Sequence, residues 1–168
     1  DTHPNNKASG KQCENYYSSE CCYTRTTGIW QTVWLEYVEK NRIEYVKYYP
    51  SAEQKNVQME ISVKGNENLS VLCSYEEKVQ GSVDISLKNG VNYVTVPLNE
   101  IYLWKAGCGR LYDVELTYGN DKVKSYFGIR TTAFDKQNYL LNGKPLYLRT
   151  VLDQGFYKKG IYTAESDE

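Results

Sequence analysis

Paired carboxyl groups are the residues of this chain that could hydrolyse a bond, with one acting as an acid and the other as a nucleophile or base. Three sets lie close together in the sequence: Glu76 with Glu77, Asp113 with Glu115, and Glu165, Asp167 and Glu168. Neighbouring residues of a strand point to opposite faces, so Glu76 and Glu77 cannot converge on one bond. Asp113 and Glu115 share the polar face of an amphipathic strand. We therefore predict that all of these groups are solvated, and no catalytic residue is assigned.

The single histidine and the cysteines indicate neither a metal site nor a nucleophile. His3 has no Cys or Ser partner arrangement, and no Cys pair has zinc-ligand spacing. The five cysteines are Cys13, Cys21, Cys22, Cys73 and Cys108. Free thiols are expected, which leaves the compartment open while favouring the cytoplasm over the periplasm. No metal and no cofactor are expected.

Length and charge limit the architecture and the partners. With 168 residues and 40% hydrophobic content, the chain can bury one ordinary core and has room for part of a second unit. A complete (β/α)₈ barrel needs roughly 250 residues. Twenty basic and 21 acidic residues leave a net charge of −1, which argues against nucleic-acid and anionic-membrane partners. No apolar run reaches the ~18 residues of a membrane span.

The 17 tyrosines are the unusual feature of the composition. Tyrosine suits the half-buried, pleated positions of β-strands. Packing in a sandwich therefore explains most of them. An aromatic surface that stacks on sugars is the alternative, and the sequence leaves both interpretations open.

Two-residue periods dominate the middle of the chain and predict short strands. Apolar and polar residues alternate over residues 57–64, 69–75, 83–88, 94–98, 112–118 and 123–129. Turn signals separate them, including Gly65-Asn66, Asn89-Gly90 and Gly119-Asn120, and Pro97 suggests a sheet edge. No segment of twelve residues has a helical period. The pattern predicts an all-β fold, an immunoglobulin-like antiparallel β-sandwich over residues 38–135.

The segments that flank this core have less regular patterns. Residues 1–22 are polar and irregular, whereas Thr27 to Val38 alternate in a way that predicts a strand covered on both faces. Pro50-Ser51 and the polar residues up to Asn56 predict a turn or linker. A last hairpin is expected around Asn142-Gly143.

Four segments, in order, resemble glycoside hydrolase family 2, the β-galactosidase and β-glucuronidase type. They are Tyr23 to Glu36, Leu103-Trp104 with Leu111-Tyr112-Asp113-Val114, Ser125 to Arg130, and Leu141 to Arg149 with Val151 to Gly155. The resemblance covers roughly residues 21–168. Members of this family contain a jelly-roll domain, an immunoglobulin-like sandwich and a catalytic (β/α)₈ barrel.

The resemblance implies a domain division and a function for the parent enzyme. Residues 1–37 would end the jelly roll with a remnant strand. Residues 38–135 would be the sandwich, and residues 136–168 would hold the lead-in hairpin and first strand of the barrel. The family's two catalytic glutamates lie on later barrel strands, so this segment alone is expected to be an inactive scaffold. The parent would be a retaining enzyme that hydrolyses terminal β-linked sugars such as galactose or glucuronate.

By the same resemblance, Asp153 and Gln154 are the residues expected near the substrate. They follow the first barrel strand, and barrel strands point their C-terminal ends at the active site. Gln154 stands about where many members place a sugar-contacting histidine. The sequence is equally compatible with a role in which these two loop residues only shape the rim of the active site. The chain departs from the family at Thr150, where a glycine is usual, and over residues 105–109 and 152–155. The sugar therefore remains open.

The expected partners are the other domains of the parent enzyme and its carbohydrate substrate, with a homo-oligomer as a further option. Trp30, Trp34 and Trp104 are expected as buried core or interface anchors. Without the flanking domains, Trp30, Trp34, Leu146 and Leu148 would form an exposed apolar patch that favours self-association. Two other functions stay open: a stand-alone carbohydrate-binding module and an adhesion module. The lead-in hairpin argues against the adhesion module.

Overall fold

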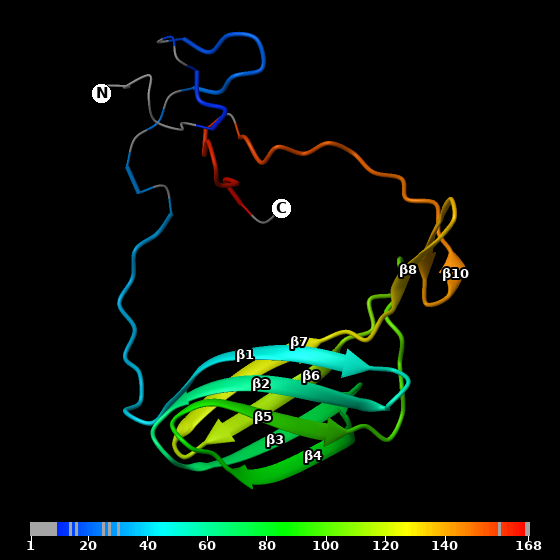
Figure 1. Ribbon diagram of the computed structural model, residues 1–168. Helices are drawn as coiled ribbons and strands as arrows, with labels where there is room; N and C mark the ends of the chain where they lie inside the picture. Colours follow the sequence, from blue (N-terminus) through cyan, green and yellow to red (C-terminus); the bar gives the residue numbers. More distant parts are fainter. Residues whose placement is uncertain are drawn as a thin grey trace. The chain divides into compact units, whose positions relative to one another are not determined.

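The computed structural model describes residues 10–13, 15, 17–24, 26, 28–29, 31–157 and 159–166. The chain divides into two compact units, Tyr37–Arg149 and a second one made of Asp1–Glu36 with Thr150–Glu168. Strands account for all of the regular elements in the described residues (Figure 1). In this part of the chain no helix is long and apolar enough to cross a membrane.

Two antiparallel sheets form the sandwich of the larger unit. One sheet has the order β1-β2-β5, and the other has the order β4-β3-β6-β7. The strands of the first are β1 (Arg42–Ser51), β2 (Asn56–Lys64) and β5 (Gly90–Pro97). Those of the second are β3 (Asn68–Tyr75), β4 (Lys78–Ser86), β6 (Tyr112–Tyr118) and β7 (Asp121–Phe127). Figure 1 shows β1, β2 and β5 in one layer and the other four strands in a second layer. The predicted all-β sandwich is confirmed.

The core lies between these two sheets and follows the predicted alternation. Val57, Met59 and Ile61 of β2 face Leu69, Val71 and Cys73 of β3 and the inner residues of β6 across it, and each is fully buried. Each buried Val, Leu, Ile or Met side chain stabilises the fold by about 1.5–3 kcal/mol relative to leaving it exposed. The alternation in the sequence is therefore the main source of the fold.

Strand β1 was not predicted, because Pro50 was interpreted as part of a turn. In the structure Pro50 lies in β1 opposite Val57. Since β2 is the one described strand that pairs with β1, a residue without an N–H is tolerated on the unpaired side of β1. Across the sandwich, the backbone nitrogen of Ile43 in β1 donates to Asp121 Oδ2 in β7 at 2.8 Å. One pair of sheet edges is therefore joined by a side chain.

The opposite pair of sheet edges meets at a bulge in β4. The register of β3 and β4 shifts between Cys73 and Ser74, which leaves Gln80 as the additional residue. Gln80 is buried, and its carbonyl oxygen accepts from the backbone nitrogen of Asn99 at 2.7 Å. A Cβ atom on Gly81 would lie 2.0 Å from the carbonyl oxygen of Pro97. Only glycine fits at this position.

A small hairpin sheet completes the larger unit. It consists of β8 (Thr132–Asp135), β9 (Asn138–Leu141) and β10 (Lys144–Pro145), in the order β10-β9-β8. Asn142 and Gly143 connect β9 to β10 with φ values of 52° and 73°. Asparagine and glycine tolerate this left-handed conformation, so the predicted Asn-Gly turn is confirmed.

The structure differs from the prediction in the segments that flank the sandwich. The described residues between Gly28 and Lys40 form no strand, and the Trp34 side chain is 68% exposed. Residues 146–156 form no strand either. An alternating pattern becomes a strand only where a neighbouring strand satisfies its backbone groups, and neither segment has one here. Trp34 is therefore not a buried anchor in this structure. Trp30 lies outside the described residues.

Candidate functional site

Trp104 lies where three segments of the larger unit meet. Its backbone nitrogen donates to the carbonyl oxygen of Ile129 at 2.8 Å. The guanidinium carbon of Arg130 lies 5.2 Å from the centre of the Trp104 ring, within the range of a cation–π contact. Asn142 Nδ2 donates to the carbonyl oxygen of Trp104 at 2.9 Å. We call Trp104, Ile129, Arg130 and Asn142 the Trp104 junction.

Local geometry explains why the Trp104 junction forms. A Cβ atom on Gly128 would lie 3.3 Å from Leu111 Cδ2 and 3.6 Å from Trp104 Cβ, so the chain passes close beside both side chains. Asn142 also exchanges two hydrogen bonds with Thr131: its backbone nitrogen donates at 2.9 Å, and its Oδ1 accepts at 3.0 Å. The hairpin is therefore connected to the sandwich through one asparagine whose polar groups are satisfied.

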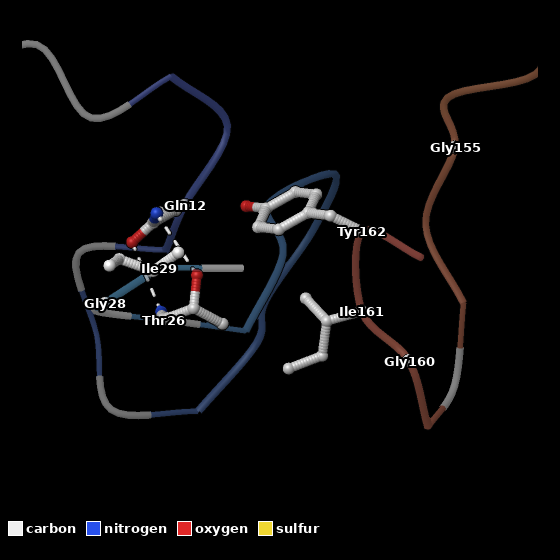
Figure 2. Close-up of a pocket in the computed structure, with 8 residues that line it drawn as sticks. All are labelled: Gln12, Thr26, Gly28, Ile29, Gly155, Gly160, Ile161 and Tyr162. Atoms are coloured by element: carbon white, nitrogen blue, oxygen red, sulfur yellow. Dashed lines mark hydrogen bonds between the residues drawn. The ribbon is translucent and has the colours of Figure 1, made fainter. Parts of the chain in front are cut away.

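The second candidate site is a pocket of about 790 Å³ in the smaller unit. Its walls come from the two ends of the described chain: Gln12, Thr26, Gly28 and Ile29 from one, and Gly155, Gly160, Ile161 and Tyr162 from the other. Figure 2 shows Gln12, Thr26 and Ile29 on one side of the pocket, with Ile161 and the Tyr162 ring facing them.

Uncharged polar groups give this pocket its chemistry. Gln12 Nε2 donates to Thr26 Oγ1 at 3.4 Å, and the Thr26 backbone nitrogen donates to Gln12 Oε1 at 3.3 Å (Figure 2). Tyr162 adds an aromatic wall. Among the described residues that line the pocket there is no carboxyl, imidazole, amine, guanidinium or thiol group. The described lining residues can therefore bind hydroxyl groups and an apolar face.

Gln154 and Asp153 lie on the C-terminal segment beside this pocket. Gln154 Oε1 accepts hydrogen bonds from Lys11 Nζ at 2.9 Å and from the Tyr23 hydroxyl. Asp153 Oδ1 accepts from the backbone nitrogen of Gly155 at 2.8 Å. Both side chains are exposed, and neither lines the pocket. The structure thus brings Gln154, but not Asp153, into contact with the N-terminal segment.

Aromatic residues that sequence reasoning did not single out hold these two segments together. The rings of Tyr23 and Phe156 are stacked with centroids 4.4 Å apart, and Phe156 meets Tyr162 edge to face at 6.3 Å. Tyr23 begins the first of the four segments that resemble the family, and this was its only signal in the sequence. Phe156 and Tyr162 follow the last matched segment and carry no pattern of their own.

The paired carboxyl groups are solvent-exposed wherever the structure describes them. Glu76 and Glu77 occupy the turn between β3 and β4, with φ values of 48° and 64°. Glu115 pairs with Lys124 at 3.2 Å, and Glu165 pairs with Lys159 at 3.0 Å. None of the carboxyl groups in the described residues is buried. His3, Asp167 and Glu168 lie outside the described residues.

None of the five cysteines forms a disulfide bond in the structure. Cys73 is fully buried in the core, whereas Cys21 is exposed. In the described part of the chain, no group of three or more His, Cys, Asp or Glu side chains could hold a metal ion.

Comparisons with known proteins follow the same boundaries as the sandwich. Residues 41–130 match the family described as Glycosyl hydrolases family 2. A β-glucuronidase from Faecalibacterium prausnitzii has a similar structure, with 29% identity, a TM-score of 0.53, and coverage of 64% of this chain and 18% of that one. No curated protein matches the chain.

Two further β-glucuronidase structures share the fold. One, from Ruminococcus gnavus, has 17% identity and a TM-score of 0.50 and covers 65% of this chain and 19% of its own. The other, from Lactobacillus rhamnosus, has 18% identity with the same TM-score and the same two coverages. This chain spans about a fifth of the length of these structures. Because the matched family segment extends over more than half of the chain and coincides with the β1–β7 sandwich, the chain belongs to glycosyl hydrolase family 2.

Proposed function

We propose that this chain is a non-catalytic scaffold segment of a retaining β-glycosidase that hydrolyses terminal β-linked sugars. The observation that carries the proposal is the Trp104 junction. Three of the four segments that resemble the family meet there, and the contacts between them are structural ones: two hydrogen bonds of 2.8 and 2.9 Å and a guanidinium 5.2 Å from the Trp104 ring centre. A junction of this kind fixes the direction in which the chain leaves the sandwich. That is the role expected of a scaffold.

The proposed domain division is residues 1–37 as the end of a jelly roll, 38–135 as the sandwich, and 136–168 as the start of the barrel. The contacts of Tyr23 with Phe156 and Gln154 support a direct contact between jelly roll and barrel in the parent enzyme. In that arrangement Asp153 and Gln154 would lie near the substrate. The hydrogen bonds from Lys11 and Tyr23 would then set the orientation of the Gln154 amide.

A β-glucuronide is the substrate that we propose for the parent enzyme. The 29% sequence identity between this chain and the F. prausnitzii β-glucuronidase supports this proposal. A β-galactoside is the competing substrate within the same family type.

The test compares the purified 168-residue chain with the product of the complete reading frame that encodes it. Nitrophenyl β-D-glucuronide and nitrophenyl β-D-galactoside serve as the two substrates. We expect turnover of the glucuronide by the complete product and none by the chain alone, because no buried carboxyl group is present in its described residues. Turnover by the purified chain, or a complete product without glycosidase activity, would contradict the proposal.

A Gln154→Ala substitution in the complete product tests the substrate-proximal role. A sugar-contacting Gln154 predicts a KM raised by about tenfold, the equivalent of one lost hydrogen bond of ~1.4 kcal/mol. Unchanged kinetics with lower thermal stability would assign Gln154 to structure alone.

A further inference from the structure

The outer face of the β1-β2-β5 sheet carries a group of exposed tyrosines. Tyr45 and Tyr49 of β1 are 40% and 49% exposed, and Tyr93 of β5 is 65% exposed. Strand β2 lies between them and places Glu60 opposite Lys47 on one side and opposite Tyr93 on the other. We call these five residues the tyrosine face.

Glu60 connects the tyrosine face through hydrogen bonds. Its Oε1 accepts from Lys47 Nζ at 2.8 Å and from the Tyr45 hydroxyl at 3.0 Å. Lys47 Nζ also lies 5.1 Å from the centre of the Tyr45 ring. The hydrogen bond from Lys47, followed by that from Tyr45, lowers the pKa of Glu60 below its ordinary value. An ionised carboxylate and an aromatic ring are therefore held in fixed positions beside each other.

This combination suits a sugar better than a protein partner. A sugar ring has an apolar C–H face that packs on the negative face of an aromatic ring, and its hydroxyl groups bond to charged acceptors and donors. Burying Lys47 and Glu60 under a protein would remove their hydration, and both residue types are depleted from the centres of protein interfaces. Sugar hydroxyls can instead replace the hydrating water.

We propose that the tyrosine face binds a neutral oligosaccharide. Tyr45 and Tyr49 lie four residues apart on one strand, and Tyr93 lies two strands away from β1, so the three rings are separated by roughly 10–13 Å. This spacing exceeds the width of one sugar ring, which points to a chain of several sugars. Lys47 is already paired with Glu60 at 2.8 Å, so its charge is offset and gives an acidic sugar no advantage over a neutral one. The proposal is thus independent of the glucuronide cleavage suggested for the parent enzyme, and either can fail alone.

The first experiment titrates the ¹⁵N-labelled 168-residue chain with four neutral hexasaccharides: cellohexaose, laminarihexaose, xylohexaose and maltohexaose. Hexa-galacturonate serves as the acidic comparison. We expect at least one neutral probe to shift amide resonances of β1, β2 and β5, while hexa-galacturonate binds more weakly. No shift with any neutral probe at millimolar concentration would overturn the proposal. Shifts confined to the pocket around Gln12 and Tyr162 would also overturn it.

Variants then test the individual side chains. Tyr93→Ala and Tyr49→Ala should each weaken binding between about threefold and tenfold, the effect of one lost aromatic contact. Tyr126→Ala is the matched control, because Tyr126 is also 65% exposed but lies on β7 in the other sheet. It should leave binding unchanged. Equal losses in Tyr93→Ala and Tyr126→Ala would refute a specific site.

Glu60→Gln separates charge from shape. The amide keeps the size of the side chain while removing the negative charge, so the preference for neutral over acidic hexasaccharides should shrink. Circular dichroism and the Tm of each variant check that the fold is intact. A preference that stays the same in Glu60→Gln would exclude Glu60 as the source of the selectivity and contradict the proposal.

Discussion

The Tyr112 hydroxyl accepts a hydrogen bond from the backbone nitrogen of Tyr102 at 2.7 Å. The same hydroxyl donates to the carbonyl oxygen of Glu100 at 2.8 Å. Tyr112 is fully buried at the start of β6, and its ring is stacked on Phe127 with centroids 5.0 Å apart. This arrangement is a tyrosine corner of the kind found in immunoglobulin-like sandwiches. It attaches the long connection between β5 and β6 to the core.

Tyr112→Phe should lower the free energy of unfolding by about 1–3 kcal/mol, because the backbone groups of Glu100 and Tyr102 would lose their partner. Urea denaturation followed by circular dichroism measures the change. Tyr126→Phe, at an exposed position of β7, should change stability by less than about 0.5 kcal/mol. A Tyr112→Phe variant as stable as this control would show that water replaces the hydroxyl at the corner.

Tyr48→Phe should have the opposite outcome. The Tyr48 hydroxyl is buried and has no partner with hydrogen-bond geometry among the described residues. Burial raises its pKa, and Ser125 offsets part of this rise. Removing an unsatisfied buried hydroxyl should leave stability unchanged or raise it by about 1 kcal/mol. The same urea titration applies. A loss of more than about 1 kcal/mol would reveal a partner such as an ordered water.

Gly81→Ala should destabilise the sandwich by about 3 kcal/mol, because the new methyl group would collide with the Pro97 carbonyl where β4 meets β5. Gly109→Ala is the control. Its Cβ atom would lie 3.4 Å from Trp104 Nε1, an ordinary contact, and its φ is not in the left-handed region. Thermal melts of both variants give the comparison. Equal Tm values would mean that the two edges separate at little cost.

The Cys73 thiol should react only when the protein unfolds. Burial raises its pKa from 9.0 to about 11, so the neutral thiol is favoured in the folded state. A folded-state pKa above the unfolded value contributes stability that is complete below pH 9 and is lost as the pH rises from about 9 to 11. The free energy of unfolding should therefore fall more steeply between pH 9 and 11 in the unsubstituted 168-residue chain than in its Cys73→Ala variant.

A thiol reagent at neutral pH checks the same property directly. Exposed Cys21 should be modified quickly, and Cys73 should be modified at the rate of global unfolding. Rapid modification of Cys73 in the folded chain would show that the sandwich opens locally at β3.

Asn142→Gly should release the hairpin without unfolding the sandwich. Glycine keeps the left-handed backbone, but the side-chain bonds to Trp104 and Thr131 are lost. Two hydrogen bonds of about 0.5–1.5 kcal/mol each predict that amides of β8 and β9 exchange with deuterium roughly 5- to 150-fold faster. Asn120→Gly, in the turn between β6 and β7, should leave these rates unchanged. Faster exchange throughout the sandwich would mean that the two parts unfold together.

The alternation of apolar and polar residues was sufficient to predict most of the sandwich, but it predicted neither strand β1 nor the conformation of the segment before it. Strands such as β2 and β6 have one buried and one solvated face, so their alternation is visible in the sequence. Strand β1, which contains Pro50, was not predicted. The alternating residues up to Val38 were predicted to form a strand, but the described residues of this segment form none. The causes differ: Pro50 was interpreted as a turn although it lies on an edge strand, whereas the described residues up to Val38 have no neighbouring strand to pair with.

The candidate sites were less predictable, because their contacts are tertiary. The amide of Gln154 meets a tyrosine 131 residues away, and Asn142 meets Trp104 over a separation of 38 residues. Family resemblance identified the segments that contain these residues. The resemblance did not identify the side chains that are in contact, because these contacts depend on how segments distant in sequence pack together.

Strands β1 and β7 lie side by side and run in the same direction. Their first residues are joined by the Ile43–Asp121 hydrogen bond, and the rings of Tyr48 and Phe127 lie 5.7 Å apart near their ends. The chain therefore enters the sandwich at Arg42 and leaves it after Phe127 from the opposite end. The two points are separated by about the length of a seven-residue strand, roughly 23 Å. Loops can lengthen and surface residues can change without altering this separation. The sandwich thus sets a fixed distance between the point where the chain enters it and the point where the chain leaves it.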